Sequence, residues 1–114
     1  MGASKTEYFS REQNELAILF KAIAHPARIA IVEYLLKTDT CICGDIVNEL
    51  PLAQPTVSQH LKELKNAGII KGTIEGTAIC YCLSSETLQK FEMYFSAISS
   101  KLKAKSCETE TKCC

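Results

Sequence analysis

Residues 51–83 read PLAQPTVSQHLKELKNAGIIKGTIEGTAICYCL, and this stretch decides the fold. Val57, Leu61 and Leu64 stand at helical spacing, so they predict a helix that turns this apolar side inward. Gly68 follows it at the position where a residue with positive φ commonly ends a helix. The stretch therefore begins with an amphipathic helix whose opposite side is polar.

Two strands are predicted after this helix, over residues 69–74 and 77–83. Both segments are rich in β-branched and aromatic residues, which favour strands. Glu75-Gly76 lies between them and supplies a residue that tolerates positive φ, as a tight hairpin requires. We therefore expect a β-hairpin directly behind the helix.

A short helix is predicted before the amphipathic one, over roughly residues 44–50, ending at Pro51. Residues 51–54 are then the only connection to the longer helix, which begins at Pro55. A short helix, a tight turn and a longer helix with a polar outer side form a helix-turn-helix, and the hairpin behind it is a wing. The predicted fold class is mostly α with a small β-hairpin, a winged helix-turn-helix.

Two further helices are predicted nearer the N-terminus. Ser10 and Gln13 form a capping-box pattern, so the first helix is expected to start near Arg11. Pro26 suits the first turn of the second. The positions expected to be buried are Leu16, Leu19, Phe20 and Ile23 in the first helix and Ile29, Val32, Leu35 and Leu36 in the second.

A last helix is expected after Ser84 or Ser85, either of which can cap it. Its apolar residues alternate steps of three and four, which is the heptad spacing of a helix-packing seam. The seam can pack on its own domain or form a dimer interface with the first helix. We favour a homodimer, because so long a stripe exceeds what one small core needs. The expected dimer-interface residues are Leu16, Phe20, Leu88, Phe91, Phe95 and Ile98.

The 114 residues fit one domain, which we place at residues 10–103, between a flexible N-terminus (1–9) and a flexible, cysteine-containing tail (104–114). Thirteen basic and thirteen acidic residues give no net charge, so attraction to DNA must come from local placement. The sequence has no apolar run long enough to span a membrane and no apolar signal core, which predicts a cytoplasmic protein.

Residues 20–29 read FKAIAHPARI and residues 56–70 read TVSQHLKELKNAGII. Together, in this order and followed by the predicted wing, they resemble the ArsR family of metal-sensing repressors. The resemblance covers roughly residues 12–100. It implies a homodimer that binds double-stranded operator DNA without a cofactor and releases it when an inducer binds.

The polar side of the long helix is expected to read DNA, because the N-terminal end of the second helix of such a motif enters the major groove. Gln59 can pair with an adenine edge, and lysines can neutralise phosphates. The acidic Glu75 at the wing tip would repel phosphate, so we expect weak wing contacts. His60 can instead be a hydrogen-bonded structural residue. The expected DNA-binding residues are Gln54, Thr56, Ser58, Gln59, His60, Lys62, Lys65 and Lys71.

Cys41-Ile42-Cys43 lies just before or at the start of the short helix, where the resembled arsenic sensors carry a Cys-x-Cys motif. A helix start favours the thiolate form, which binds soft cations. Residues two apart on a helix point about 200° apart, so one ion could reach both sulfurs only by unwinding the helix start. That strain would act on the DNA-reading helix.

A third thiolate is needed, because trivalent arsenic prefers three sulfurs and Ile46 stands where many arsenic sensors carry a third cysteine. The expected source is Cys113 or Cys114 of the tail, with Cys107 as a further candidate. The last helix, residues 85–102, has no His and no Asp, which argues against a zinc site there.

Cys80 and Cys82 form a second Cys-x-Cys, on the predicted second strand, where alternate residues share one side. They are ordinary wing residues, a second metal site or a redox pair. The other side of this strand, with Ile79, Tyr81 and Leu83, is expected to face the core. Seven cysteines, an odd count without a signal peptide, argue against a disulfide scaffold.

The sequence thus predicts a repressor that leaves its operator when arsenite or antimonite binds Cys41 and Cys43. One alternative is the same repressor sensing cadmium, lead or thiol oxidation. Another is a thiol-based metal-binding or trafficking protein with no DNA role. An enzyme is not expected, because the sequence shows no phosphate loop and no Ser-His-Asp arrangement.

Overall fold

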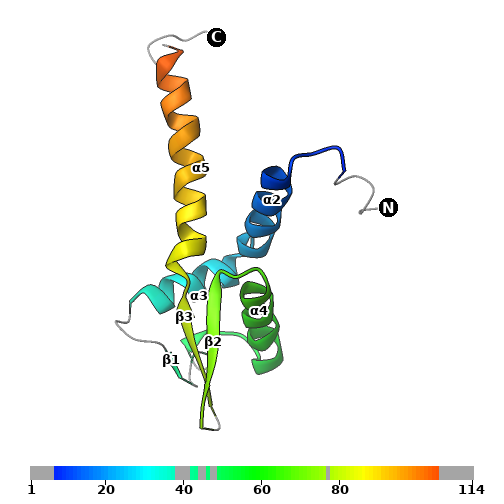
Figure 1. The fold of residues 1–114 in the computed structure, drawn as a ribbon. Coiled ribbons are helices and arrows are strands. Elements are labelled where there is room, and N and C mark those ends of the chain that lie inside the picture. Colours follow the sequence, from blue (N-terminus) through cyan, green and yellow to red (C-terminus); the bar gives the residue numbers. More distant parts are fainter. Residues whose placement is uncertain (1–6, 38–41, 44–45, 47–48, 77, 106–114) are drawn as a thin grey trace. The chain divides into compact units, whose positions relative to one another are not determined.

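The computed structural model describes residues 7–37, 42–43, 46, 49–76 and 78–105. Its elements are α2 (Arg11–Ile23), α3 (Pro26–Leu36), β1 (Ile42–Cys43), α4 (Gln54–Asn66), β2 (Ile70–Glu75), β3 (Ala78–Leu83) and α5 (Ser85–Ala104) (Figure 1). The chain forms two compact units, divided between Ser84 and Ser85, so that α5 belongs to the second. The helices with the β2–β3 hairpin confirm the predicted fold class, a winged helix-turn-helix.

Helix α2 begins where the capping box predicts. The Ser10 hydroxyl accepts a hydrogen bond from the Gln13 amide at 3.0 Å, and the Gln13 side-chain oxygen accepts one from the Ser10 amide at 2.9 Å. These two bonds satisfy amides that a helix start otherwise leaves without partners. Leu16 and Leu19 are buried as predicted, and Ala22 joins them.

Helix α3 buries a different side from the one predicted. Ile31 and Leu35 are buried, whereas Ile29 is 46% exposed and Leu36 is 72% exposed, so the prediction was wrong for the latter two. The helix reads PARIAIVEYLL and is apolar on nearly every side, so its spacing does not single out an inward side. The contacts of α3 with α4 and with β3 determine which side of α3 is buried.

Helix α4 buries the predicted apolar side, from Val57 to Leu64. Its end is a Schellman motif, in which the Gly68 amide donates to the Lys65 carbonyl and the Ile69 amide donates to the Leu64 carbonyl, both at 3.0 Å. Gly68 has a φ of 84°, and Leu64 and Ile69 are both fully buried. This cap directs the chain from α4 into β2.

The hairpin forms as predicted, and its turn lies one residue later than expected. Glu75 pairs with Ala78, which leaves Gly76, with a φ of 65°, in the turn. The prediction for the sides of β3 was wrong for Ile79, which is 43% exposed, whereas Cys80 on the opposite side of the strand is 1% exposed. Strand alternation fixes which residues share a side, but not which side the core covers.

A third strand was not predicted. Ile42–Cys43 forms β1, which pairs antiparallel with β3, so that the sheet order is β1-β3-β2. We expected these residues just before or within a helix start, where binding would unwind the helix. Because Ile42–Cys43 forms a strand and not a helix start, an ion could bind here without unwinding a helix. Of the helix predicted for residues 44–50, the structure describes Ile46 and Glu49, in 3-10 conformation, and residue 50; the rest lies outside the described residues.

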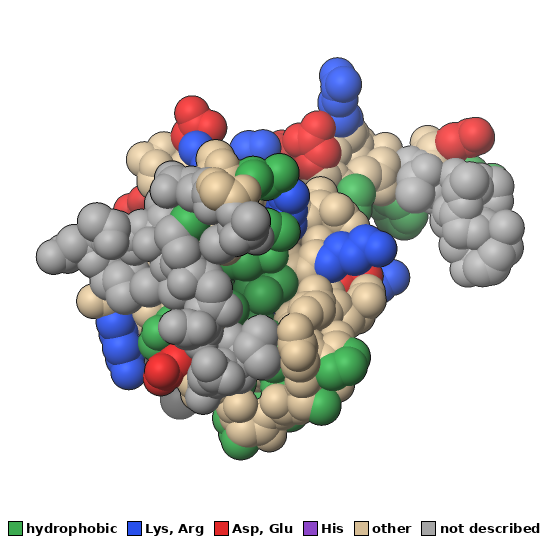
Figure 2. Space-filling view, turned by 90° about the horizontal axis from the view of Figure 1, so that it is seen from below, with side chains coloured by type: hydrophobic (Ala, Val, Ile, Leu, Met, Phe, Trp, Pro, Cys, Tyr) green, Lys and Arg blue, Asp and Glu red, His purple; other side chains and the backbone are tan. Residues whose placement is uncertain are grey.

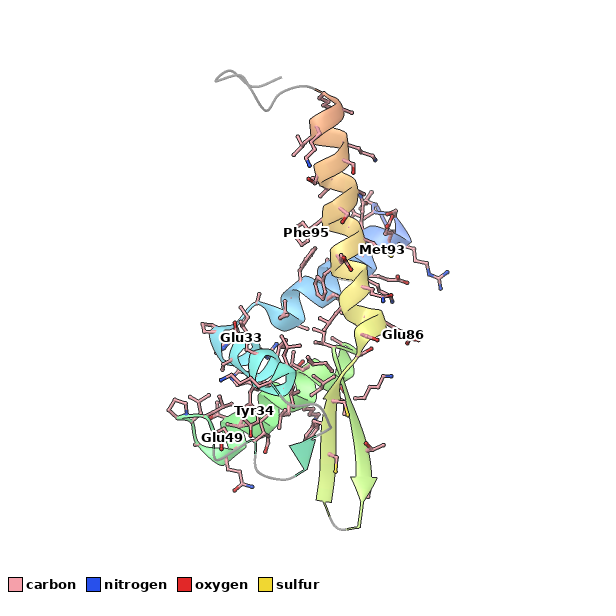
Figure 3. The ribbon with its side chains drawn as sticks, turned by 90° about the vertical axis from the view of Figure 1, so that its left-hand side faces the viewer. Glu33, Tyr34, Glu49, Glu86, Met93 and Phe95 are labelled. Atoms are coloured by element: carbon pink, nitrogen blue, oxygen red, sulfur yellow. The ribbon has the colours of Figure 1, made fainter. Side chains whose placement is uncertain are left out.

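The second unit holds helix α5, of which no residue is buried. Met93, Phe95 and Leu102 are its most exposed large apolar side chains, and Figure 3 shows Met93 and Phe95 projecting from the helix. None of the helices in the described part of the chain is long and apolar enough to cross a membrane.

Replacing Gly68 tests the cap that joins α4 to the wing. A Gly68→Ala variant should lower the free energy of unfolding by about 1 kcal/mol, because a side chain at positive φ crowds the backbone. Gly68→Asn should lose less, since Asn tolerates this conformation. Urea denaturation measures both. Equal stability of the Ala variant and the unmodified chain would contradict the assigned cap.

Candidate nucleic-acid interface

The outer side of α4 is exposed, as a groove-reading helix requires. Six of the predicted DNA-binding residues lie on this helix and are exposed: Gln54, Thr56, Ser58, Gln59, Lys62 and Lys65. Lys71, also exposed, lies on β2 of the adjoining hairpin. Hydroxyl, amide and ammonium groups are the ones that bind base edges and phosphates. The structure therefore brings these seven side chains to one helix and the strand that follows it, and their contact with DNA stays a prediction.

The basic side chains on the face drawn in Figure 2 are dispersed. In Figure 2, the described Lys and Arg side chains on the face shown form separate groups rather than one continuous patch. This agrees with the absence of net charge in the sequence. Binding to DNA would then depend on hydrogen bonds and a few ion contacts more than on a broad positive field.

Two of these side chains have contacts of their own. The Gln59 amide nitrogen donates to a Glu63 carboxylate oxygen at 2.9 Å, which uses one of its two N–H groups and leaves the other N–H and the amide oxygen for a base. The Lys65 side chain lies over Gly72, where an added Cβ would come within 3.3 Å of its Cε. Lys65 thereby connects the end of α4 to β2.

His60 differs from the other predicted DNA-binding residues because it is buried, at 8% exposed. Arg28 Nε donates to His60 Nδ1 at 3.0 Å, and Arg28 Nη1 donates to the Ala22 carbonyl at 2.9 Å. The His25 ring lies 4.5 Å from the His60 ring, centroid to centroid. The structure therefore supports a structural role for His60 rather than a contact with DNA.

This cluster fixes α4 against the start of α3. His25 caps α3, because its Nδ1 accepts a hydrogen bond from the Ala27 amide at 3.0 Å. Arg28 then bridges α3, the end of α2 and α4 through the bonds given above. The sequence does not predict a role for His25 or Arg28, since only the fold places them beside His60.

The cysteines are arranged differently from the prediction. Cys43 is the partner of Cys80 in the pairing of β1 with β3, so the two Cys-x-Cys motifs meet in one sheet. Cys80 and Cys82 are each disulfide-bonded, against the expectation of reduced thiols. Among the side chains that the structure describes, no three His, Cys, Asp or Glu residues form a metal-binding group. Cys41, Cys107, Cys113 and Cys114 lie outside the described residues.

The residues expected at a dimer interface fall into two groups. Leu16 is buried within the single chain, and Phe20, Leu88 and Phe91 are half-buried. Phe95 and Ile98, both on α5, are exposed. An exposed pair of large apolar side chains one helical turn apart is available to a partner.

The geometry defines a winged helix-turn-helix protein in which the polar side of α4 is exposed, and comparisons with known proteins agree. Residues 25–71 match the family described as "Bacterial regulatory protein, arsR family". The chain is 43% identical over 70 residues to the HTH-type transcriptional repressor SmtB of Mycobacterium tuberculosis, a match that covers 61% of this chain and 51% of SmtB. The chain thus spans about half the length of that relative.

Two solved structures extend the likeness. The cadmium metal-sensor CMTR from Mycobacterium tuberculosis is 36% identical, with a TM-score of 0.52 over 64% of this chain and 74% of CMTR. An ArsR-like transcriptional regulator from Rhodococcus sp. RHA1 shares the fold at 20% identity, with a TM-score of 0.70 over 85% of this chain and 91% of that one. The chain belongs to the ArsR family of bacterial regulatory proteins.

The His60 contact predicts how stability depends on pH. Burial first, and then the charges of His25 and Arg28, lower the pKa of His60 below its usual value. The unfolded chain therefore takes up this proton at a higher pH than the folded chain does. The free energy of unfolding should fall as the pH drops below about 6.5 and stop falling below the folded pKa.

Denaturation by urea at several pH values tests this, with His60→Gln as the variant that cannot titrate. The loss of stability below neutral pH should be smaller in His60→Gln. His25→Gln is the matched control. It should show most of the loss of stability below neutral pH, because burial and Arg28 still lower the pKa of His60. Parallel pH profiles for His60→Gln and the unmodified chain would show that His60 does not carry the effect.

Proposed function

We propose that this chain is a DNA-binding transcriptional repressor that acts as a cytoplasmic homodimer. The observation that carries the proposal is the division of α4 into a buried apolar side and an exposed polar side. A helix held by its core side can enter the major groove with its other side. Membership of a family of bacterial regulatory proteins supports the same role.

We further propose that the repressor leaves its operator when a thiophilic metal or metalloid binds its cysteine thiolates. Arsenite or antimonite bound through Cys41 and Cys43 is the specific form, and cadmium or lead is the alternative. The likeness to a cadmium metal-sensor supports metal sensing without choosing among these ions. Thiolates suit all of them, because soft ligands select soft ions.

Thiol oxidation is a second candidate signal, and one observation favours it. Cys80 and Cys82 are disulfide-bonded in the structure, on a strand that belongs to the wing. A disulfide formed or reduced there would change the wing without any metal. In this version DNA binding should respond to peroxide and to a thiol reductant and not to arsenite.

The homodimer rests on exposed apolar side chains of α5. Phe95 is 55% exposed, and Ile98 and Leu102 follow it at spacings of three and four residues. Such a stripe is the seam through which helices associate. Two reading helices related by a two-fold axis would then bind two half-sites of one operator.

Binding of a duplex taken from the region upstream of the gene tests the DNA role. A Ser58→Ala, Gln59→Ala variant should bind this duplex about tenfold or more weakly, because it loses polar groups that face the base edges. Gln89→Ala, an exposed position on α5, is the control and should bind normally. Fluorescence anisotropy at fixed salt measures both affinities.

Equal affinity of the double variant and the unmodified chain would contradict a reading role for α4. Failure of the unmodified chain to bind its own upstream DNA even at low salt would favour the metal-trafficking alternative. Addition of arsenite, antimonite, cadmium, lead or peroxide to the preformed complex then identifies the signal. A Cys41→Ser, Cys43→Ser variant should still bind DNA and no longer release it on addition of arsenite.

A further inference from the structure

The sheet brings together cysteines that lie far apart in the sequence. Strand β1 pairs antiparallel with β3, and Cys43 is the direct partner of Cys80. Opposed residues of an antiparallel pair occupy the same side of the sheet, with Cβ atoms about 4.5–5.5 Å apart. The register therefore sets the position of Cys43 next to that of Cys80.

Cys82 belongs to the same group of positions. It follows Cys80 by two residues on β3, so it shares the side of the strand that Cys80 occupies, about 7 Å further along. The three positions form a triangle on one side of a small sheet. Two sulfurs bound to one ion at about 2.3 Å each lie roughly 3.8 Å apart, which rotation of cysteine side chains can reach from such spacings.

The disulfides are an independent sign that sulfurs converge here. Cys80 and Cys82 are both disulfide-bonded, so each has another cysteine sulfur at bonding distance. Sulfur atoms that meet to this extent can be bridged by an ion once they are reduced. A dithiol reductant supplies the two electrons and two protons that each disulfide takes up.

The surroundings suit a soft ion. Cys80 is almost fully buried and Cys82 is half-buried, which limits competition by water. Lys71 is the partner of Cys82 on the other edge of β3, so an ammonium lies on the neighbouring strand. A neighbouring cation favours thiolate over thiol, and the thiolate is the metal-binding form.

We propose that Cys43, Cys80 and Cys82 form a three-thiolate site, spanning β1 and β3, for a soft trivalent metalloid or divalent metal ion. Of Cys43, the structure describes the backbone, and the proposal rests on its register. In this site Cys80 and Cys82 supply the two thiolates that Cys43 needs, in place of Cys41 and the tail cysteines. The inference deepens the proposed function, since it names the ligands of the inducer.

The position of the site also explains how binding of a metal would affect the binding of DNA. Strand β1 precedes α4 in the chain, and β3 follows it, so an ion held between them ties together the segments on both sides of the reading helix. Strand β2 begins four residues after α4 ends, and the Ser84 amide at the end of β3 donates to the Ile69 carbonyl at 2.9 Å. A movement of β3 is thus transmitted to the end of α4 and to Lys71.

Metal binding by the full, reduced chain tests the site without any use of DNA. The measurements are the affinity for Cd(II) in competition with a chelator and the number of sulfur neighbours of bound Cd(II) and of bound arsenite from X-ray absorption. Cys82→Ser should bind about 100-fold or more weakly, since even loss of groups outside the ligand set costs 10- to 100-fold. Its sulfur count should fall by one.

A matched Cys113→Ser, Cys114→Ser variant should keep the affinity and the sulfur count of the unmodified chain. Cys80→Ser should behave as Cys82→Ser does. If circular dichroism shows that the buried Cys80→Ser substitution unfolds the chain, the metal affinity and sulfur count of Cys82→Ser alone test the site, because Cys82 is only half-buried. Unchanged binding by Cys82→Ser, or loss of binding in the tail variant, would overturn the proposal. A chain that binds metal in this way and fails to bind DNA would instead refute the proposed function alone.

Discussion

The pairing of β1 with β3 is the constraint on which the rest of the structure depends. It makes β3 the central strand, with the segment before α4 on one edge and the segment after α4 on the other. In the sequence, helix α4 therefore lies between β1 and β2, and both of these strands pair with β3. A change in the distance between β1 and β3 would move the chain segments that lead into and out of α4, which is the element proposed to touch DNA.

Helix α4 is held at three places that act together. Its apolar side is buried, its end is fixed by the Gly68 cap, and its middle is fixed by the bond from Arg28 to His60. These contacts leave the polar side of α4 exposed. A helix held at both its middle and its end would move together with the sheet. A small shift of the sheet would then alter the position of α4 in a DNA groove.

Local patterns in the sequence predicted the parts of the fold that local physics decides. The capping box at Ser10, the inward side of α4 and the hairpin behind Gly68 all follow from spacing and turn chemistry. Long-range contacts could not be predicted in this way. The inward side of α3, the burial of His60 by Arg28 and the strand at Ile42 depend on which elements pack together. The meeting of the two Cys-x-Cys motifs is of this second kind, because only strand register aligns residues 43 and 80.

The most direct test of this account is the β1–β3 pairing in the fully reduced protein. Nuclear Overhauser contacts between backbone protons report such pairing in a uniformly labelled sample kept in a dithiol reductant. The account predicts a cross-strand contact between residues 43 and 80, together with the usual contacts of β2 with β3. Intact β2–β3 contacts with no contact between residues 43 and 80 would contradict it.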